Sequence, residues 1–184
     1  MKRLFLIVAV ILTSATIVNA QEQYKLFFFH AGAGVHVACD NVSADQKLYG
    51  TTPAFDFGFG VRPVGGLNLR VGFQGFKAKR DEVSFNYGYA HFDAMWSITE
   101  MKCITEKGKC KHFIAAPYLS AGGGFGDKVS FGYGAGALIG ARLNNHFDIL
   151  LDGRATRLKS SRAFAGGTGK CSDVSATINL VYNF

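Results

Sequence analysis

Long apolar runs are missing from this 184-residue chain once its first twenty residues are passed. No later segment approaches the roughly 20 consecutive apolar residues that a membrane-spanning helix needs. The sequence also lacks a basic run with interleaved aromatic residues, so nucleic acid is not a predicted partner. It has no Gly-x-Ser-x-Gly segment, the nucleophile turn of one large hydrolase class. These absences argue against helical membrane proteins and nucleic-acid-binding proteins, and they leave no catalytic signature.

Cysteine is scarce, with four in the whole chain. Cys103 and Cys110, with His112 close behind, are spaced unlike a zinc site, so we predict no metal and no cofactor. In an exported chain, four cysteines indicate two disulfide bonds, for which three pairings are possible.

The first twenty residues read as a secretory signal peptide. Lys2 and Arg3 precede an apolar run, and Val18-Asn19-Ala20 has the small-x-small form of a cleavage site. A membrane anchor is the alternative, but the run is short and polar residues follow at once. We therefore expect a single mature domain over 21–184. Loss of the two basic residues lowers the formal net charge from +7 to +5, a bias that favours lipid phosphates as partners.

Period-two alternation of apolar side chains recurs along the mature chain and predicts strands. The clearest pair flanks residues 63–66, a tight turn by its proline and glycine content. We expect eight strands in total, at about 24–38, 53–62, 67–74, 84–99, 112–125, 131–142, 147–154 and 176–184.

Two of these strands are poorly specified. The fifth is weakly patterned. The fourth has conflicting registers, which a bulge near 89–91 would reconcile. One register carries Phe85, Tyr87 and Tyr89, and the other carries Phe92, Ala94, Trp96 and Ile98.

The last nine residues are the most informative segment. Apolar residues at 176, 178, 180, 182 and 184 alternate with mostly polar ones, and the last residue is aromatic. This pattern resembles the C-terminal insertion signal of bacterial outer-membrane barrels, here carried by Ile178, Leu180, Tyr182 and Phe184. The resemblance implies recognition by the barrel-assembly machinery. An amphipathic strand closing a soluble sheet is the alternative.

Over essentially all of 21–184 the chain resembles the OmpA/OmpX-type outer-membrane β-barrel family. The resemblance implies an all-β, eight-stranded antiparallel up-and-down transmembrane barrel in the bacterial outer membrane. It also implies short periplasmic turns and longer external loops, at 39–52, 77–83 and 158–173. No further periplasmic domain is expected. The strand order of such a barrel selects two disulfides, Cys39–Cys171 outside and Cys103–Cys110 on the periplasmic side.

The implied register turns charged side chains toward the lumen. An eight-stranded barrel is only wide enough to be filled by its side chains, so these charges must pair. We therefore expect a structural charge network and no general diffusion pore. Its predicted members are Asp56, Arg62, Arg70, Arg142, Asp148, Asp152 and Arg154.

The expected role is non-enzymatic, in envelope integrity or surface interaction. One alternative is a lipid-modifying barrel enzyme, in which His30, His36 or His91 would activate Ser84 or Ser120. Another is a secreted lipocalin-like barrel, whose apolar face would point inward. The loops could contact lipopolysaccharide phosphates or an external ligand through Lys77, Lys79, Arg80, Lys159, Arg162 and Lys170.

Overall fold

The computed structural model describes residues 25–42, 45–48, 50–64, 66–80, 83–98, 113–126, 129–158 and 170–184. The predicted signal peptide and the Cys103–Cys110 pair lie outside these residues. The strands are β1 (Phe27–Val42), β2 (Asp45–Leu48), β3 (Thr52–Val64), β4 (Leu67–Arg80), β5 (Val83–Trp96), β6 (Phe113–Phe125), β7 (Val129–Arg142), β8 (Phe147–Leu158) and β9 (Lys170–Asn183). Among the described residues, no helix is long and apolar enough to cross a membrane.

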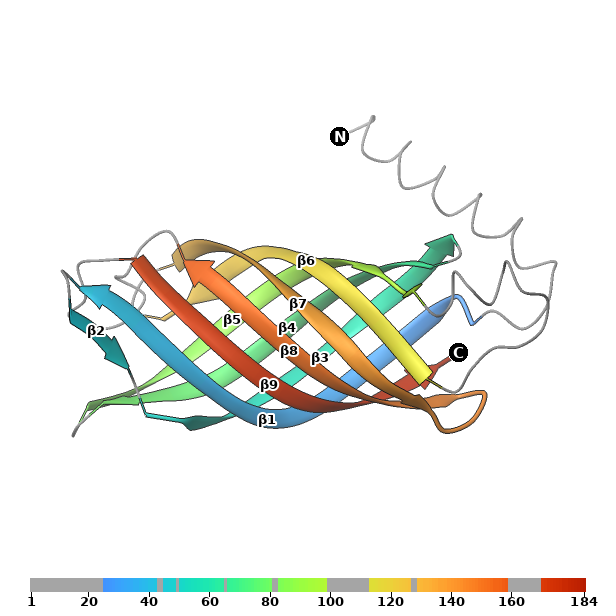
Figure 1. Ribbon diagram of the computed structural model, residues 1–184, viewed down its shortest axis with the longest axis horizontal. Coiled ribbons are helices and arrows are strands. Elements are labelled where there is room, and N and C mark those ends of the chain that lie inside the picture. The colour runs from blue at the N-terminus through green and yellow to red at the C-terminus, as the bar shows by residue number, and fades with distance from the viewer. Residues whose placement is uncertain are drawn as a thin grey trace, which may run out of the picture.

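Eight of the strands close into a barrel (Figure 1). Each long strand pairs antiparallel with the next along the chain, and β1 pairs with β9 to complete the ring. The predicted up-and-down eight-stranded barrel is therefore confirmed. The short strand β2 forms a hairpin with the C-terminal end of β1, in which Cys39–Val42 pair with Asp45–Leu48.

The direction of the apolar faces is the one predicted for a membrane barrel. Large apolar side chains point outward along every long strand, opposite to the arrangement in a lipocalin-like barrel. On β9, Ile178 is 60 % exposed whereas its neighbour Asn179 is 1 % exposed. Other outward residues are Phe29, Val35, Phe55, Phe57, Phe59, Val71, Phe92, Leu119, Phe131, Ile139, Leu151 and Leu180.

The predicted bulge in the fourth strand is wrong. β4 and β5 pair without a register shift from Leu67 and Trp96 to Arg80 and Val83. Tyr87 and Tyr89 consequently face the lumen, where they are 3 % and 0 % exposed. Phe92 and Trp96 face outward in the same unbroken register. The sequence misled because these tyrosines fill the lumen, an environment in which we expected mainly small or charged residues.

Two predicted loops are partly strand. Residues 77–83 are mostly strand, because β4 continues to Arg80 and β5 begins at Val83. Much of 39–52 belongs to the β1–β2 hairpin. The register between β3 and β4 shifts between Val61 and Val64, close to the turn predicted at 63–66. In this turn Gly66 adopts φ 85°, a left-handed conformation that suits glycine. These strands continue further because backbone pairing does not require an apolar face.

The lumen is stratified. An apolar layer near the loop end contains Phe76, Tyr87, Tyr89 and Leu158. A second apolar layer near the end that carries Phe184 contains Phe28, Met95, Ile114, Ala116, Tyr118, Leu138, Leu150 and Val181. A cavity of about 30 Å³ lies in this second layer, room for little more than one or two water molecules. Between the two layers lies a charged layer.

Candidate functional site

The predicted lumen residues fall into two groups in the structure. Asp56, Arg70, Asp152 and Arg154 lie in the middle of the lumen, each 2 or 3 % exposed. Arg62, Arg142 and Asp148 gather nearer the Phe184 end, where Arg62 and Asp148 line the same small cavity as the second apolar layer. There the Arg142 Nε donates to Asp148 Oδ1 at 3.2 Å, and the Asn183 Nδ2 donates to Asp148 Oδ2 at 2.9 Å.

The middle group is organised around Asp93, which is not among the lumen residues predicted from the sequence. The Arg70 Nε donates to Asp93 Oδ2 at 2.7 Å, and the Arg154 Nη2 donates to the same oxygen at 3.0 Å. Arg70 also donates from Nη2 to Asp152 Oδ2 at 2.9 Å. Two guanidinium groups therefore share two carboxylates, contributed by β4, β5 and β8.

Tyr118 links this cluster to the wall of the barrel. Its hydroxyl donates to Asp152 Oδ1 at 2.5 Å and accepts from the Arg154 Nε at 3.2 Å. The guanidinium carbons of Arg70 and Arg154 lie 5.2 and 5.4 Å from its ring centre. Tyr118 thus satisfies charged partners with its hydroxyl while its ring belongs to the second apolar layer.

Two histidines extend the cluster toward Asp56. The Nδ1 of His91 lies 3.0 Å from Asp93 Oδ2, and its Nε2 lies 3.4 Å from Asp56 Oδ1. His30 approaches the same Asp56 oxygen at 3.4 Å. We call Asp56, Asp93, Asp152, Arg70, Arg154, His30, His91 and Tyr118 the charged layer. Its three carboxylates exceed its two guanidinium groups by one.

The missed members were hidden by weak strand patterns. Asp93 and His91 lie on β5, where the conflicting registers obscured which residues face inward. Tyr118 lies on β6, where small residues and Pro117 obscure the alternation. A usable signal was the two-residue period of a strand. If Trp96 faces outward, the even-numbered residues of the strand do too, and the odd-numbered His91 and Asp93 face the lumen.

The histidines weighed for catalysis all lie in the closed lumen. His30, His36 and His91 are at most 4 % exposed. The ring nitrogens of His91 lie 3.0 Å from Asp93 and 3.4 Å from Asp56. His36 stacks on Phe76 with ring centres 3.4 Å apart and contacts Asp173 at 3.4 Å. The side chain of Ser84 lies outside the described set. Within that set, no group of three metal-ligating side chains could hold a metal ion.

Two residues of the predicted insertion signal, Tyr182 and Phe184, form part of an aromatic belt at one end of the barrel. Tyr182 and Phe184 stack with ring centres 5.9 Å apart, and Phe184 stacks on Phe27 at 6.1 Å. The ring of Phe59 contacts those of Phe27 and Phe184, with ring centres 5.7 and 5.9 Å apart. Aromatic rings gathered at the edge of an apolar band are typical of the interface between a bilayer and water.

The cysteines of the closing seam lie on neighbouring strands. In the β1–β9 register Cys39 is opposite Ser172 and Cys171 is opposite Asp40, so the two cysteines are one register position apart. The Cys39–Cys171 and Cys103–Cys110 disulfides stay predictions, which peptide mapping without reduction can test.

Known proteins resemble this chain in fold. No protein-family model matches it, and no curated protein matches it in sequence. Its structure resembles the neisserial surface protein A (NspA), with a TM-score of 0.61 and 14 % identity over 86 % of this chain and 97 % of that one. It also resembles Ail, the attachment invasion locus protein of Yersinia pestis, with a TM-score of 0.55 and 14 % identity over 88 % and 100 % of the chains. For the outer membrane protein OprG of Pseudomonas aeruginosa, the TM-score is 0.54 and the identity 9 %, over 88 % and 97 %. At such low identity these likenesses show a shared fold: the chain is an eight-stranded barrel of the kind found in small outer-membrane proteins.

Proposed function

We propose that this chain is a non-enzymatic barrel of the bacterial outer membrane, with a filled lumen and a role in envelope integrity or surface interaction. The proposal rests on one observation: the outer face of the barrel is apolar while side chains fill its lumen. The outward face needs lipid around it. Apolar side chains occupy the lumen on both sides of the charged layer, beside buried polar groups such as His36, Asp173 and Asn68.

Cell fractionation and electrical recording test this proposal. We expect the protein in the outer-membrane fraction, with a gel mobility in detergent that changes on heating, because a closed barrel resists detergent until it unfolds. In planar bilayers we expect no stable conductance, since side chains fill the lumen of an eight-stranded barrel. Recovery in the soluble periplasmic fraction would contradict the membrane assignment, and a stable open channel would contradict the filled lumen.

Two outward basic residues near the loop end support lipopolysaccharide as a partner. Lys77 on β4 and Arg157 on β8 are both exposed on the outer face. Arg157 lies beside Tyr133 in the register, so a charge and an aromatic ring share the outer rim. Such cations can pair with lipid phosphates. We expect the K77Q/R157Q variant to retain less lipopolysaccharide on purification than the wild type. Equal retention would remove these two residues from the proposal.

The lipid-modifying enzyme is the second candidate, and it has weaker support. His30, His36 and His91 are buried inside the lumen, where a lipid substrate cannot reach them. The similar folds reported above do not decide the matter, because fold does not imply function.

A further inference from the structure

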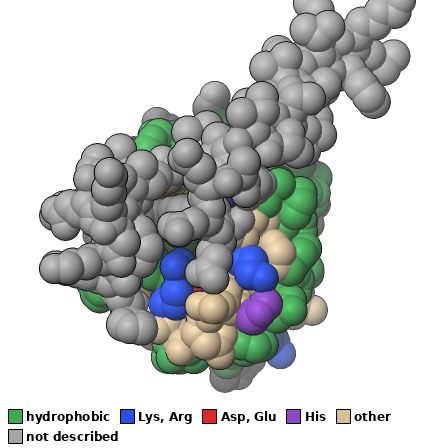
Figure 2. All heavy atoms as spheres, turned by 90° about the vertical axis from the view of Figure 1, so that its right-hand side faces the viewer, with side chains coloured by type: hydrophobic (Ala, Val, Ile, Leu, Met, Phe, Trp, Pro, Cys, Tyr) green, Lys and Arg blue, Asp and Glu red, His purple; other side chains and the backbone are tan. Residues whose placement is uncertain are grey.

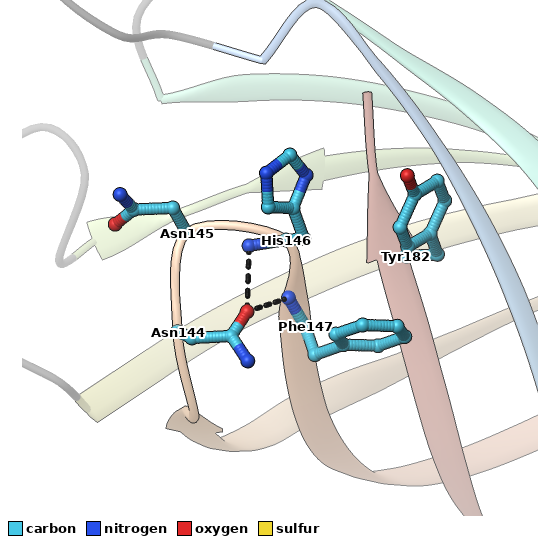
Figure 3. A pocket seen from close by; sticks show the side chains of 5 residues that line it. All are labelled: Asn144, Asn145, His146, Phe147 and Tyr182. Atoms are coloured by element: carbon cyan, nitrogen blue, oxygen red, sulfur yellow. Dashed lines mark hydrogen bonds between the residues drawn. The ribbon is translucent and has the colours of Figure 1, made fainter.

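An open pocket of about 520 Å³ lies at the Phe184 end of the barrel, where the turn between β7 and β8 meets the end of β9 (Figure 3). Its lining residues are Asn144, Asn145, His146, Phe147 and Tyr182. Figure 2 views this end and shows Lys, Arg and His side chains among uncharged ones where the surface is drawn in colour. The pocket adjoins the aromatic belt, which includes Tyr182.

One side of the pocket presents amide donors. The Asn144 Oδ1 accepts hydrogen bonds from the backbone nitrogens of His146 and Phe147, at 2.8 and 2.9 Å. These bonds fix the turn and occupy the oxygen, so Asn144 presents its Nδ2 donors to a ligand. Asn145 is exposed beside it. Figure 3 shows the Asn144 amide between the two arms of the turn, the Asn145 amide pointing outward from the turn, and the Tyr182 and Phe147 rings to the right of both.

The other side of the pocket is an aromatic corner with an acceptor. The His146 ring stacks on Tyr182 at 5.9 Å with planes 17° apart, and Phe147 meets Tyr182 at 5.1 Å and 54°. The His146 Nδ1 lies 3.2 Å from the carbonyl oxygen of Asn183. Because a carbonyl only accepts, Nδ1 carries the hydrogen, and Nε2 of the neutral ring is an acceptor.

We propose that this pocket binds the headgroup of a phosphatidylethanolamine molecule in the periplasmic leaflet. The ammonium lies against the faces of Tyr182 and Phe147 and donates to the His146 Nε2. A cation over an aromatic face is attracted by the ring quadrupole. The phosphate accepts from the amides of Asn144 and Asn145. The inference rests on the proposed function, since it needs this end of the barrel to lie at a membrane surface.

The residues that line the pocket suit a zwitterion in this orientation. Arg142 precedes the turn, and its Nε donates to Asp148 at 3.2 Å. Its acidic partner Asp148 is buried in the lumen and lies outside the pocket lining. A purely cationic ligand would leave the amide donors without a partner. A purely anionic one would leave the aromatic corner and the Nε2 acceptor without a partner.

Three lipids that share their acyl chains separate the contributions. Phosphatidylethanolamine supplies a cation with N–H donors, phosphatidylcholine a cation without them, and phosphatidylglycerol no cation. The full chain is exchanged into bilayer nanodiscs holding equal amounts of the three. The lipids retained after release from the disc are then counted by native mass spectrometry. We expect one molecule of phosphatidylethanolamine retained at least about threefold over phosphatidylcholine, and phosphatidylglycerol retained least.

Two variants and one control test the assignment. His146→Phe keeps a ring but removes the acceptor, so we expect the ethanolamine lipid to lose its advantage over the choline lipid. Phe147→Leu removes one aromatic ring from the pocket. We expect the retention of phosphatidylethanolamine and of phosphatidylcholine to fall toward that of phosphatidylglycerol. Leu143→Ala, next to the turn but absent from the pocket lining, is expected to behave as wild type.

The heat-dependent gel shift reports whether each variant is folded. If wild type and both folded variants retain the three lipids alike, the pocket is overturned as a headgroup site while the outer-membrane proposal stands. If the wild type shows no gel shift and no outer-membrane location, the proposed function fails first. If His146→Phe does not fold, Phe147→Leu decides, because unchanged selectivity in that variant also overturns the site.

Discussion

Replacing Asp93 by asparagine is expected to lower the free energy of unfolding of the barrel by about 3 to 5 kcal/mol, the range seen when one partner of a buried ion pair is removed. Asp93 is fully buried, and its Oδ2 contacts Arg70, Arg154 and His91 at 2.6 to 3.0 Å. The neutral amide leaves two buried guanidinium groups to share Asp152. Unfolding by urea in lipid vesicles, followed by gel mobility and by the fluorescence of the single tryptophan, Trp96, measures the loss.

Asp56→Asn is the matched control, because it removes a carboxylate of the same layer that forms no ion pair with an arginine among the described residues. Asp56 contacts His30 and His91, both at 3.4 Å. Its removal also leaves two carboxylates for two guanidinium groups, a balanced count. We therefore expect a loss of less than about half that of Asp93→Asn. Equal losses in the two variants would mean that the layer responds to total charge rather than to particular pairs.

Gly136→Ala is expected to be the most damaging single-methyl addition near the charged layer, costing about 1 to 3 kcal/mol or more. A Cβ at Gly136 would overlap the ring and hydroxyl of Tyr118 and the carbonyl oxygen of Gly153. The carbonyl belongs to the sheet and cannot give way. Tyr118 would have to move, which breaks its bonds to Asp152 and Arg154. The same vesicle unfolding experiment measures the loss.

Gly153→Ala provides the control on the neighbouring strand. Gly153 lies opposite Ala137, the next residue after Gly136, and therefore at almost the same height but on the outer face. A Cβ there would meet nothing within 4 Å. We expect its unfolding free energy to match wild type within about 0.5 kcal/mol. If Gly136→Ala were equally harmless, the lumen would have to be looser than the close approach of Tyr118 indicates.

The outward face of the barrel was readable from the sequence because lipid selects one kind of side chain. On β3, β7, β8 and β9 the outward positions are mostly apolar, and the structure keeps the predicted parity, with Leu138, Leu150 and Val181 as apolar exceptions on the inner face. The loop boundaries were less predictable. Strand β4 extends to Arg80 through charged residues, since hydrogen bonding between backbones holds a strand together beyond the apolar band.

The partners within the lumen could not be predicted from the sequence. Parity places Arg70 and Asp152 on the inner face, but which side chains meet across the lumen depends on the tilt and stagger of all eight strands. Asp93 shows the difficulty. It is the centre of the network, yet its strand carries tyrosines on the inner face, so its own inward orientation was obscured.

The seam between β1 and β9 bears on how the barrel is made. It joins residues as far apart in sequence as His36 and Asp173, which are separated by 137 positions yet in contact. All other pairings between long strands join consecutive segments of the barrel and can form as hairpins. Closing the seam therefore has the highest contact order of any step, and contacts of high order form slowly. Until it forms, β1 and β9 are unpaired edges, so an assembly factor that holds one edge would shorten the interval in which two open barrels can join.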